Sequence, residues 1–155
     1  MAERTTPVLT EGQVAEILPQ GKTFRFVGEV LEMDPGKRVV ARMVDLTRPE
    51  FANIMEAHFP GNPIVPGTII QEALEQAAIL AIAPVVGQDK FGVIMGVDGF
   101  RFRRLTKPGE EVLLEADITR LRSSAGKAVV KATVGDQLAV EGEIMFGIAD
   151  KSKLT

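Results

Sequence analysis

Cysteine, tryptophan and tyrosine are absent from this chain of 155 residues, and histidine occurs once. Without cysteine the protein has no disulfide framework and no thiol nucleophile. One histidine and no cysteine leave too few ligands for a transition-metal site, so we expect no bound metal. The sequence also lacks a glycine-rich phosphate loop of the P-loop or dinucleotide-binding kind, and we expect no cofactor. Any catalysis therefore depends on ordinary acids, bases and backbone groups, and not on a phenol.

The charge balance is slightly acidic, with a net charge of −3 at pH 7. That charge argues against nucleic acid as the main partner. The first residues carry no apolar signal core. The longest apolar run, residues 77–86, is too short to span a bilayer. We therefore expect a soluble, cytoplasmic protein with a single domain over residues 1–155 and flexible ends at 1–9 and 149–155.

Hydrophobic periodicity and turn residues predict one long helix surrounded by strands. The helix covers residues 68–83 and is apolar almost all round, which is typical of a buried helix. A short helix over residues 10–18 precedes it. The predicted strands cover residues 23–31, 37–44, 92–102, 111–122, 127–134 and 138–146. Antiparallel strands with a single apolar helix predict an α+β fold in which the sheet wraps that helix.

The long helix also bears on the oligomeric state. One sheet does not easily cover a helix that is apolar on every side. The remaining face of the helix is expected to be buried by a second copy of the chain, since two-fold dimers are the commonest symmetric assemblies. We therefore expect a homodimer.

The single histidine stands at the start of a proline-rich loop that leads into the long helix. The loop reads His-Phe-Pro-Gly-Asn-Pro-Ile-Val-Pro-Gly over residues 58–67. Its prolines restrict the backbone, and rigid elements are used where a group must be held in one place. An imidazole is the side chain best suited to take a proton near pH 7, so His58 is a candidate catalytic base. A structural hydrogen bond is the competing role for a lone histidine.

Polar residues interrupt the apolar helix in its first half. Glu72 and Gln76 are four residues apart, so the amide is placed to hydrogen-bond the carboxyl and orient it. Glu72 and Glu75 are three apart and carry like charge, which disfavours ionising both, and apolar surroundings raise a carboxyl pKa. These features make Glu72 a candidate proton donor. The competing interpretation is that the polar residues form the solvated end of the helix.

The start of the same helix offers a third element. The amide N–H groups from Gly67 onward have no partner within the helix and carry partial positive charge, so they suit an anion or a developing oxyanion. Ordinary capping by Thr68 or by solvent is the alternative. A base, an oxyanion stabiliser and an acid for a leaving hydroxyl are the parts that a dehydratase needs. A Gly-x-Ser-x-Gly motif is absent, which argues against a serine hydrolase.

Two segments at fixed spacing resemble the signature of a known family. They are His58-Phe-Pro-Gly-x-Pro-Ile-x-Pro-Gly67 and Glu72-Ala-x-x-Gln76-Ala, and they look like those of the FabZ-type 3-hydroxyacyl-acyl carrier protein dehydratases. Weaker similarity runs over residues 17–146. The resemblance implies the hotdog fold, in which a sheet wraps a long helix, and homodimers that often assemble into a trimer of dimers.

The resemblance also implies roles for individual residues. His58 matches the catalytic histidine and Glu72 the catalytic acid, with each site taking one of them from each chain of the dimer. Gly67 matches the glycine whose N–H binds the thioester carbonyl, and we place Gln76 with it in the substrate-binding set. The implied reaction removes water from a 3-hydroxyacyl thioester on acyl carrier protein and gives the trans-2-enoyl thioester, in fatty-acid or polyketide synthesis.

A basic group of residues is the expected docking surface for the acyl carrier protein. Its members are Arg101, Arg103, Arg104 and Lys107. A solvated strand end that pairs with neighbouring acids is the alternative. Two further functions stay open for the chain as a whole. One is a hotdog thioesterase that uses Glu72 to activate water, and the other is a non-catalytic subunit that binds acyl thioesters.

Overall fold

The computed structural model of the chain describes residues 6–154. The helices are α1 (Glu11–Ile17), α2 (Ala52–Ala57) and α3 (Gly67–Val86), with short 3₁₀ helices η1 (Lys22–Phe24), η2 (Pro49–Phe51) and η3 (Lys151–Leu154). The strands are β1 (Val27–Asp34), β2 (Arg38–Met43), β3 (Lys90–Phe102), β4 (Val112–Leu121), β5 (Ala125–Val134) and β6 (Gln137–Asp150).

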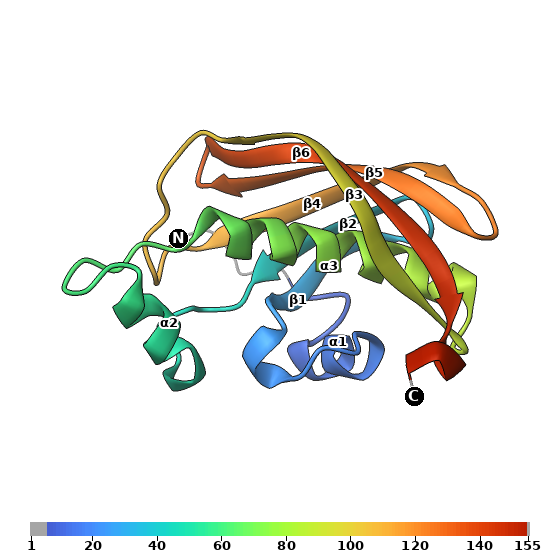
Figure 1. Cartoon of the computed structure of the whole chain (residues 1–155), viewed down its shortest axis with the longest axis horizontal. Helices are drawn as coiled ribbons and strands as arrows, with labels where there is room; N and C mark the ends of the chain where they lie inside the picture. The colour runs from blue at the N-terminus through green and yellow to red at the C-terminus, as the bar shows by residue number, and fades with distance from the viewer. Residues whose placement is uncertain (1–5, 155) are drawn as a thin grey trace.

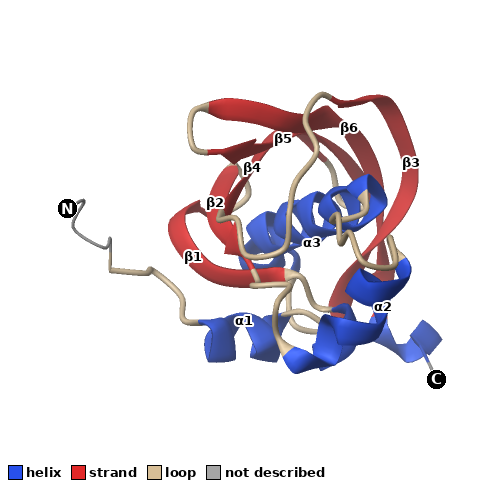
Figure 2. Ribbon diagram, turned by 90° about the vertical axis from the view of Figure 1, so that its left-hand side faces the viewer, coloured by secondary structure: helices blue, strands red, loops and turns tan. Residues whose placement is uncertain are grey.

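The strands form one sheet, and the sheet wraps α3. Six strands pair antiparallel in the order β1-β2-β4-β5-β6-β3. Figure 1 shows α3 running along the sheet, and Figure 2 shows the sheet curling around that helix. α3 contacts every strand of the sheet. This is the hotdog arrangement, and the predicted α+β fold is confirmed.

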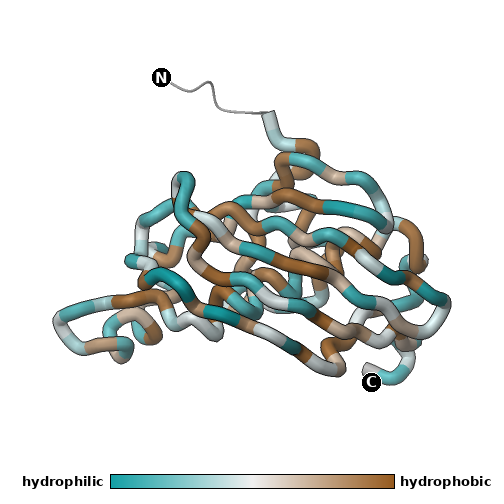
Figure 3. The backbone as a smooth tube through the Cα atoms, turned by 90° about the horizontal axis from the view of Figure 1, so that it is seen from above, coloured by the Kyte–Doolittle hydropathy of each residue, from teal (hydrophilic) through white to brown (hydrophobic). Residues whose placement is uncertain are grey.

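The core lies between the concave face of the sheet and α3. In β2 every second residue is buried, as the period of a half-buried strand requires. Figure 3 shows hydrophobic and hydrophilic residues alternating along strands of the sheet. The inward residues meet a helix whose buried face is rich in alanine, so the strands approach it closely. The buried residues of α3 are Ile70, Ala73, Leu74, Glu75, Gln76, Ala77, Ala78, Leu80, Ala81 and Ile82.

The first helix begins where the sequence predicts it. The Thr10 side chain accepts a hydrogen bond from the Gln13 N–H, and the Gln13 side chain accepts one from the Thr10 N–H. This reciprocal pair is a capping box, which fixes the start of α1. The helix ends at Ile17, just before Pro19.

The first strand begins later than the sequence predicts. Residues 23–26, which we expected to open the strand, form the end of η1 and a bend, and β1 begins at Val27. The reason is a long-range contact. The Gln76 amide of α3 donates to the Phe24 carbonyl and accepts from the Phe26 N–H, at 2.8 Å in both cases. Backbone groups that a neighbouring strand would use are thus bound to a helix side chain.

The long helix ends later than the sequence predicts. We expected it to stop at residue 83, but α3 continues through Pro84 to Val86. A proline removes one N–H and crowds the preceding turn, and near the end of a helix few hydrogen bonds remain to be lost. The helix then stops at Gly87, whose φ of 98° is open to glycine and rarely to other residues.

We expected no apolar run long enough to cross a membrane, and the length of α3 departs from that expectation. By length and composition the helix could do so, with 20 residues and a mean hydropathy of 1.5. However, 56% of that apolar window is buried inside the fold. The helix therefore behaves as the core helix of a globular domain.

Backbone hydrogen bonds join residues near both ends of the described chain to the sheet. The Val8 N–H donates to the Val30 carbonyl at 2.7 Å, and the Val30 N–H donates to the Leu9 carbonyl at 3.0 Å. At the other end β6 runs to Asp150, and the Lys151 N–H donates to the Asp89 carbonyl at 2.8 Å. Backbone pairing with β1 and with the start of β3 thus holds residues that we predicted to be flexible. Residues 1–5 and 155 of those segments lie outside the described residues.

Packing at Gly126 gives a test of this core. A methyl group there would lie 2.6 Å from the Arg120 carbonyl oxygen and 2.4 Å from Cζ of the buried Phe146 ring. Because a backbone oxygen cannot swing aside, we expect Gly126→Ala to lower the free energy of unfolding by about 1–3 kcal/mol. Gly21→Ala is the matched control, since nothing lies within 4 Å of that position and its φ is −71°. Denaturant unfolding measures both, and equal stabilities would contradict the packing.

Candidate active site

His58 is held by the backbone of its own loop. It follows α2 directly, and its Nδ1 lies 2.8 Å from the Ile64 carbonyl oxygen. The Ile64 N–H also donates to the His58 carbonyl at 2.8 Å, so the two ends of the loop are tied together. Because a carbonyl only accepts, Nδ1 carries the hydrogen and Nε2 presents its lone pair. The loop thus fixes both the orientation of the ring and the tautomer that a base requires.

A cleft of about 420 Å³ opens beside this histidine. Its lining comes from three parts of the chain: the loop with His58, the start of α3, and the end of β3 with the segment after it. Phe102 presses against the start of α3, and a methyl group at Gly67 would lie 2.5 Å from its Cδ1. The lining residues are His58, Val65, Pro66, Gly67, Thr68, Ile70, Phe102, Arg103, Arg104, Leu105 and Val140.

The start of α3 is open to this cleft. Pro66 is the N-cap, and no side chain caps the helix. The capping by Thr68 that we weighed as an alternative is therefore not formed. Within residues 6–154 the N–H groups of Gly67 and Thr68 have no acceptor; they carry the partial positive charge of a helix start, and both residues line the cavity.

Gln76 holds Glu72 in place. Its amide Nε2 donates to Oε1 of Glu72 at 3.1 Å and to the Phe24 carbonyl at 2.8 Å. Its Oε1 accepts from the Phe26 N–H, and the side chain is only 1% exposed. The predicted orienting contact is confirmed. Both N–H groups of the amide are used within the chain, where they hold Glu72 and the Phe24 carbonyl, and a part for Gln76 in substrate binding stays a prediction.

The most buried carboxyl of α3 is that of Glu75, which is 8% exposed. Burial raises the pKa of Glu75 to about 7, and a hydrogen bond with Glu72 and the charge of Glu72 act in the same direction. The Gln71 amide donates to Oε1 of Glu75 at 3.2 Å and opposes this rise. The sequence directed attention to Glu72, whereas the structure places a second carboxyl beside it in the more buried position.

Within one chain the histidine and the acid do not meet. Glu72 lies one turn into α3 and is half-buried, but it is not part of the cleft that contains His58 and Gly67. The structure therefore brings together His58 and the start of α3, and it leaves Glu72 outside their cleft.

Known proteins are similar in sequence to this chain over most of its length. A model of the FabA-like domain family matches residues 18–144. A protein from Chloroflexus aggregans is 37% identical over 148 residues, which cover 94% of this chain and 100% of that protein. One from Listeria monocytogenes is 42% identical over 142 residues, covering 91% and 96%. Both are named 3-hydroxyacyl-[acyl-carrier-protein] dehydratase FabZ. The chain belongs to the FabZ dehydratase family.

Solved structures agree on the fold. A chain of the dehydratase heterocomplex ApeI:P from Xenorhabdus doucetiae superimposes with a TM-score of 0.75 at 14% identity, covering 97% of this chain and 96% of that one. A thioesterase from Haemophilus influenzae gives 0.65 at 12% identity, covering 92% of each chain. At such low identity the likeness concerns the fold alone, which FabZ dehydratases share with thioesterases.

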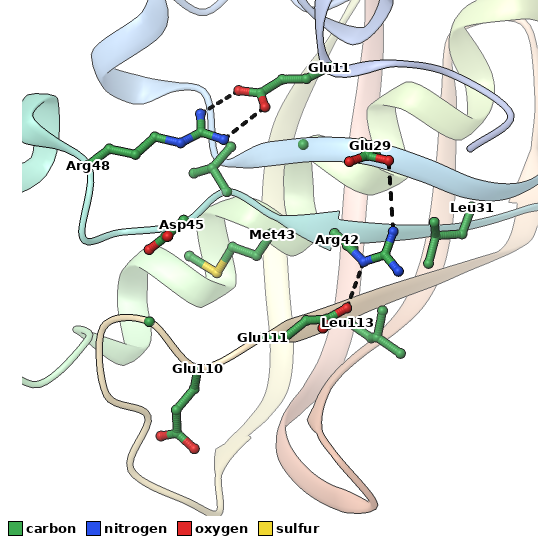
Figure 4. Close-up of a pocket in the computed structure, with 13 residues that line it drawn as sticks. Glu11, Glu29, Leu31, Arg42, Met43, Asp45, Arg48, Glu110, Glu111 and Leu113 are labelled. Carbon is green, nitrogen blue, oxygen red and sulfur yellow. Dashed lines mark hydrogen bonds and ion pairs between the residues drawn. The ribbon is translucent and has the colours of Figure 1, made fainter. Parts of the chain in front are cut away.

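A larger cavity of this FabZ-family chain lies elsewhere. It measures about 760 Å³ and is lined mainly by β1, β2 and residues 109–113. Figure 4 shows charges paired across it: Arg48 with Glu11, and Arg42 with Glu29 and Glu111. Because both of its arginines are paired with glutamates of the chain and His58 is absent from its lining, we do not assign the active site to this cavity.

The basic residues near the cleft are partly neutralised within the chain. Arg103 pairs with Glu141 at 3.2 Å, and Arg104 pairs with Glu110 at 2.8 Å. Arg101 donates to a backbone carbonyl instead, and no ion pair within residues 6–154 involves the Lys107 ammonium. The alternative of pairing with neighbouring acids thus holds for two of the four residues.

The apolar wall of the cleft was not predicted from the sequence. Phe102 is 51% exposed and Leu105 is 73% exposed, although both are large apolar residues. Val140 of β6 completes this wall. The available signal was the pair of apolar residues in a segment otherwise rich in arginine, which is unusual for a solvated strand end.

Glu75 makes stability depend on pH. Its pKa is about 7 in the folded chain against 4.5 ordinarily, so the folded state holds the proton longer and stability falls as the pH rises from 4.5 through 7. Gln cannot ionise, so we expect Glu75→Gln to raise the free energy of unfolding by roughly 2 kcal/mol at pH 8 and by much less at pH 5. Urea titrations at both pH values and one protein concentration measure this. A gain of equal size at both would contradict the raised pKa.

Proposed function

We propose that the chain eliminates water from a 3-hydroxyacyl thioester carried on acyl carrier protein and releases the trans-2-enoyl thioester. Membership of the FabZ family supports this reaction, and so does the presence of His58, Gly67 and Glu72 at the positions of the family motif. The observation that carries the proposal is the cleft in which a free imidazole Nε2 stands beside uncapped helix N–H groups.

The chemistry uses three groups in defined roles. His58 Nε2 takes the proton from C2 of the acyl chain, and the electrons of that bond form the C2=C3 double bond. The Gly67 N–H binds the thioester carbonyl oxygen, on which negative charge develops. The C3–O bond breaks, and Glu72 protonates the departing hydroxyl so that it leaves as water.

The working unit is a homodimer with two shared sites. Glu72 stands outside the cleft of its own chain, so a second copy must supply the acid. β3 is an edge strand of the sheet, and its exposed apolar residues suit pairing with another copy. Their exposed fractions are 41% for Val93, 68% for Met95 and 46% for Val97. A trimer of dimers is the larger assembly that we infer by family likeness.

The carrier protein is the expected macromolecular partner, in the cytoplasm and in fatty-acid or polyketide synthesis. An acidic carrier would be steered by positive charge at the mouth of the cleft. Arg101 and Lys107 are the strongest candidates for this docking surface, because Arg103 and Arg104 already pair with acids of the chain.

Removing the base or the acid tests the reaction. We expect His58→Ala and Glu72→Gln each to lower the rate of water loss from a 3-hydroxyacyl carrier protein by about 10²–10⁴-fold. Mass spectrometry of the acyl carrier follows the loss of water, and light scattering checks that the oligomer persists. Full activity of either variant would contradict its assigned role.

A substrate without the 3-hydroxyl group distinguishes a thioesterase from a dehydratase. An acyl thioester without the 3-hydroxyl cannot lose water, so a dehydratase leaves it intact while a thioesterase releases thiol. We expect no thiol from the wild-type chain.

Mixing the two inactive variants tests whether the site is shared between chains. A dimer of one His58→Ala chain and one Glu72→Gln chain retains one intact site. If subunits exchange at random, half of the dimers are mixed, so about one quarter of the wild-type activity should return. Refolding the variants together provides the exchange, and each variant refolded alone is the control. No recovery in confirmed mixed dimers would refute a site built from two chains.

A further inference from the structure

A second carboxyl stands beside the proposed catalytic acid and has no part in the reaction described so far. We propose that Glu75 is a positioning residue that shares one proton with Glu72, so that the pair, and not a single side chain, forms the acid of the dehydratase. This inference rests on the proposed function and extends it. The relation is built into one turn of α3, since residues three apart on a helix face each other.

The geometry is a chain of hydrogen bonds along that turn. The Phe24 and Phe26 backbone holds the Gln76 amide, which donates to Glu72 at 3.1 Å. Glu72 stands three residues before Glu75 on the same turn and raises the pKa of Glu75, and the Gln71 amide closes the chain by donating to Oε1 of Glu75 at 3.2 Å. Two carboxyls can hydrogen-bond only if a proton lies between them.

The surroundings favour one proton in the pair. Glu75 is buried, and its pKa near 7 reflects that burial first and the neighbouring carboxyl second. No lysine, arginine or histidine of residues 6–154 forms an ion pair with Glu72 or Glu75, from α3, α1 or any strand of the sheet. The ionisable group expected from outside the chain is His58 of the second copy. Because no cation of the described residues pairs with either carboxyl, two negative charges side by side are unfavourable and the pair retains a proton near neutral pH.

The proton balance of one turnover is closed. The pair gives its proton to the departing hydroxyl, which becomes water, while His58 gains the proton from C2. Repulsion between the two carboxylates left side by side opposes early loss of the proton and favours uptake of a new proton once the product has left. After the product leaves, the imidazolium releases its proton through water, and the pair takes one up. An acid with a pKa close to the working pH is the most effective donor.

The pH dependence of kcat tests the pair. Wild-type kcat should fall as the pH rises through about 7, where the pair loses its proton. In Glu75→Gln the neighbouring charge is gone, so the alkaline limb should move down by about one pH unit or more, with roughly tenfold lower kcat at pH 7.5 and near-normal kcat at pH 5.5. Glu16→Gln, at an exposed carboxyl of α1, is the matched control and should leave the limb in place.

The variant Gln71→Met should shift the alkaline limb of the kcat profile in the opposite direction to Glu75→Gln. The Gln71 amide lowers the pKa of Glu75, so its removal in Gln71→Met should shift the alkaline limb to higher pH. Opposite shifts from neighbouring substitutions are not the result of general damage to the helix. An unchanged limb in folded Glu75→Gln, or the same direction of shift in both variants, would overturn the proposal.

A direct titration needs no activity. In wild-type protein labelled with ¹³C at the glutamate carboxyls, one NMR signal should titrate near pH 7 and disappear in Glu75→Gln. If every glutamate signal titrates below about pH 5.5, the shared proton is refuted whether or not the chain is a dehydratase. Absence of water loss with this signal present would instead refute the proposed function alone.

Discussion

Burial of α3 in the hollow of the sheet is the constraint on which the rest of the structure depends. A helix that contacts every strand cannot slide or rotate without exposing apolar surface, so the positions of its residues are fixed relative to the sheet. The amide of Gln76 also fixes how α3 is oriented in the fold, because it binds backbone groups on both sides of Arg25. The same amide reaches Glu72, so the packing of the core and the placement of a functional carboxyl share one side chain.

The second constraint is the rigid loop before α3. Its prolines and its internal hydrogen bonds hold His58 so that one ring nitrogen is engaged and the other is free. The loop ends in the N-cap of the helix, which places the histidine and the uncapped N–H groups in one cleft. Glu72 of the same chain is not among the residues that line this cleft. In the homodimer that we propose, each chain supplies half of each of two sites, so pairing would serve the chemistry as well as the burial of apolar surface.

Local signals predicted much of this, and long-range contacts account for the rest. The short helix α1 and the apolar pattern of α3 depend on neighbours in sequence, and the sequence predicts both helices to within a few residues. The predicted start of β1 was wrong because the side chain of Gln76, which is distant in sequence, binds the backbone of Phe24 and Phe26. Glu75 looked like one of several polar residues of a solvated helix end. Its burial depends on how the sheet curls, which no local pattern encodes.

The contact between Phe102 and Gly67 has an evolutionary consequence. The ring fills the space that any side chain at position 67 would need, so the two sites cannot drift independently. A lineage that replaces the aromatic ring by a smaller residue would first widen the mouth of the cleft and only then tolerate a larger residue at the helix start. Related sequences should therefore show correlated substitution at these two positions. The change at position 102 of β3 should precede the change at position 67 of α3.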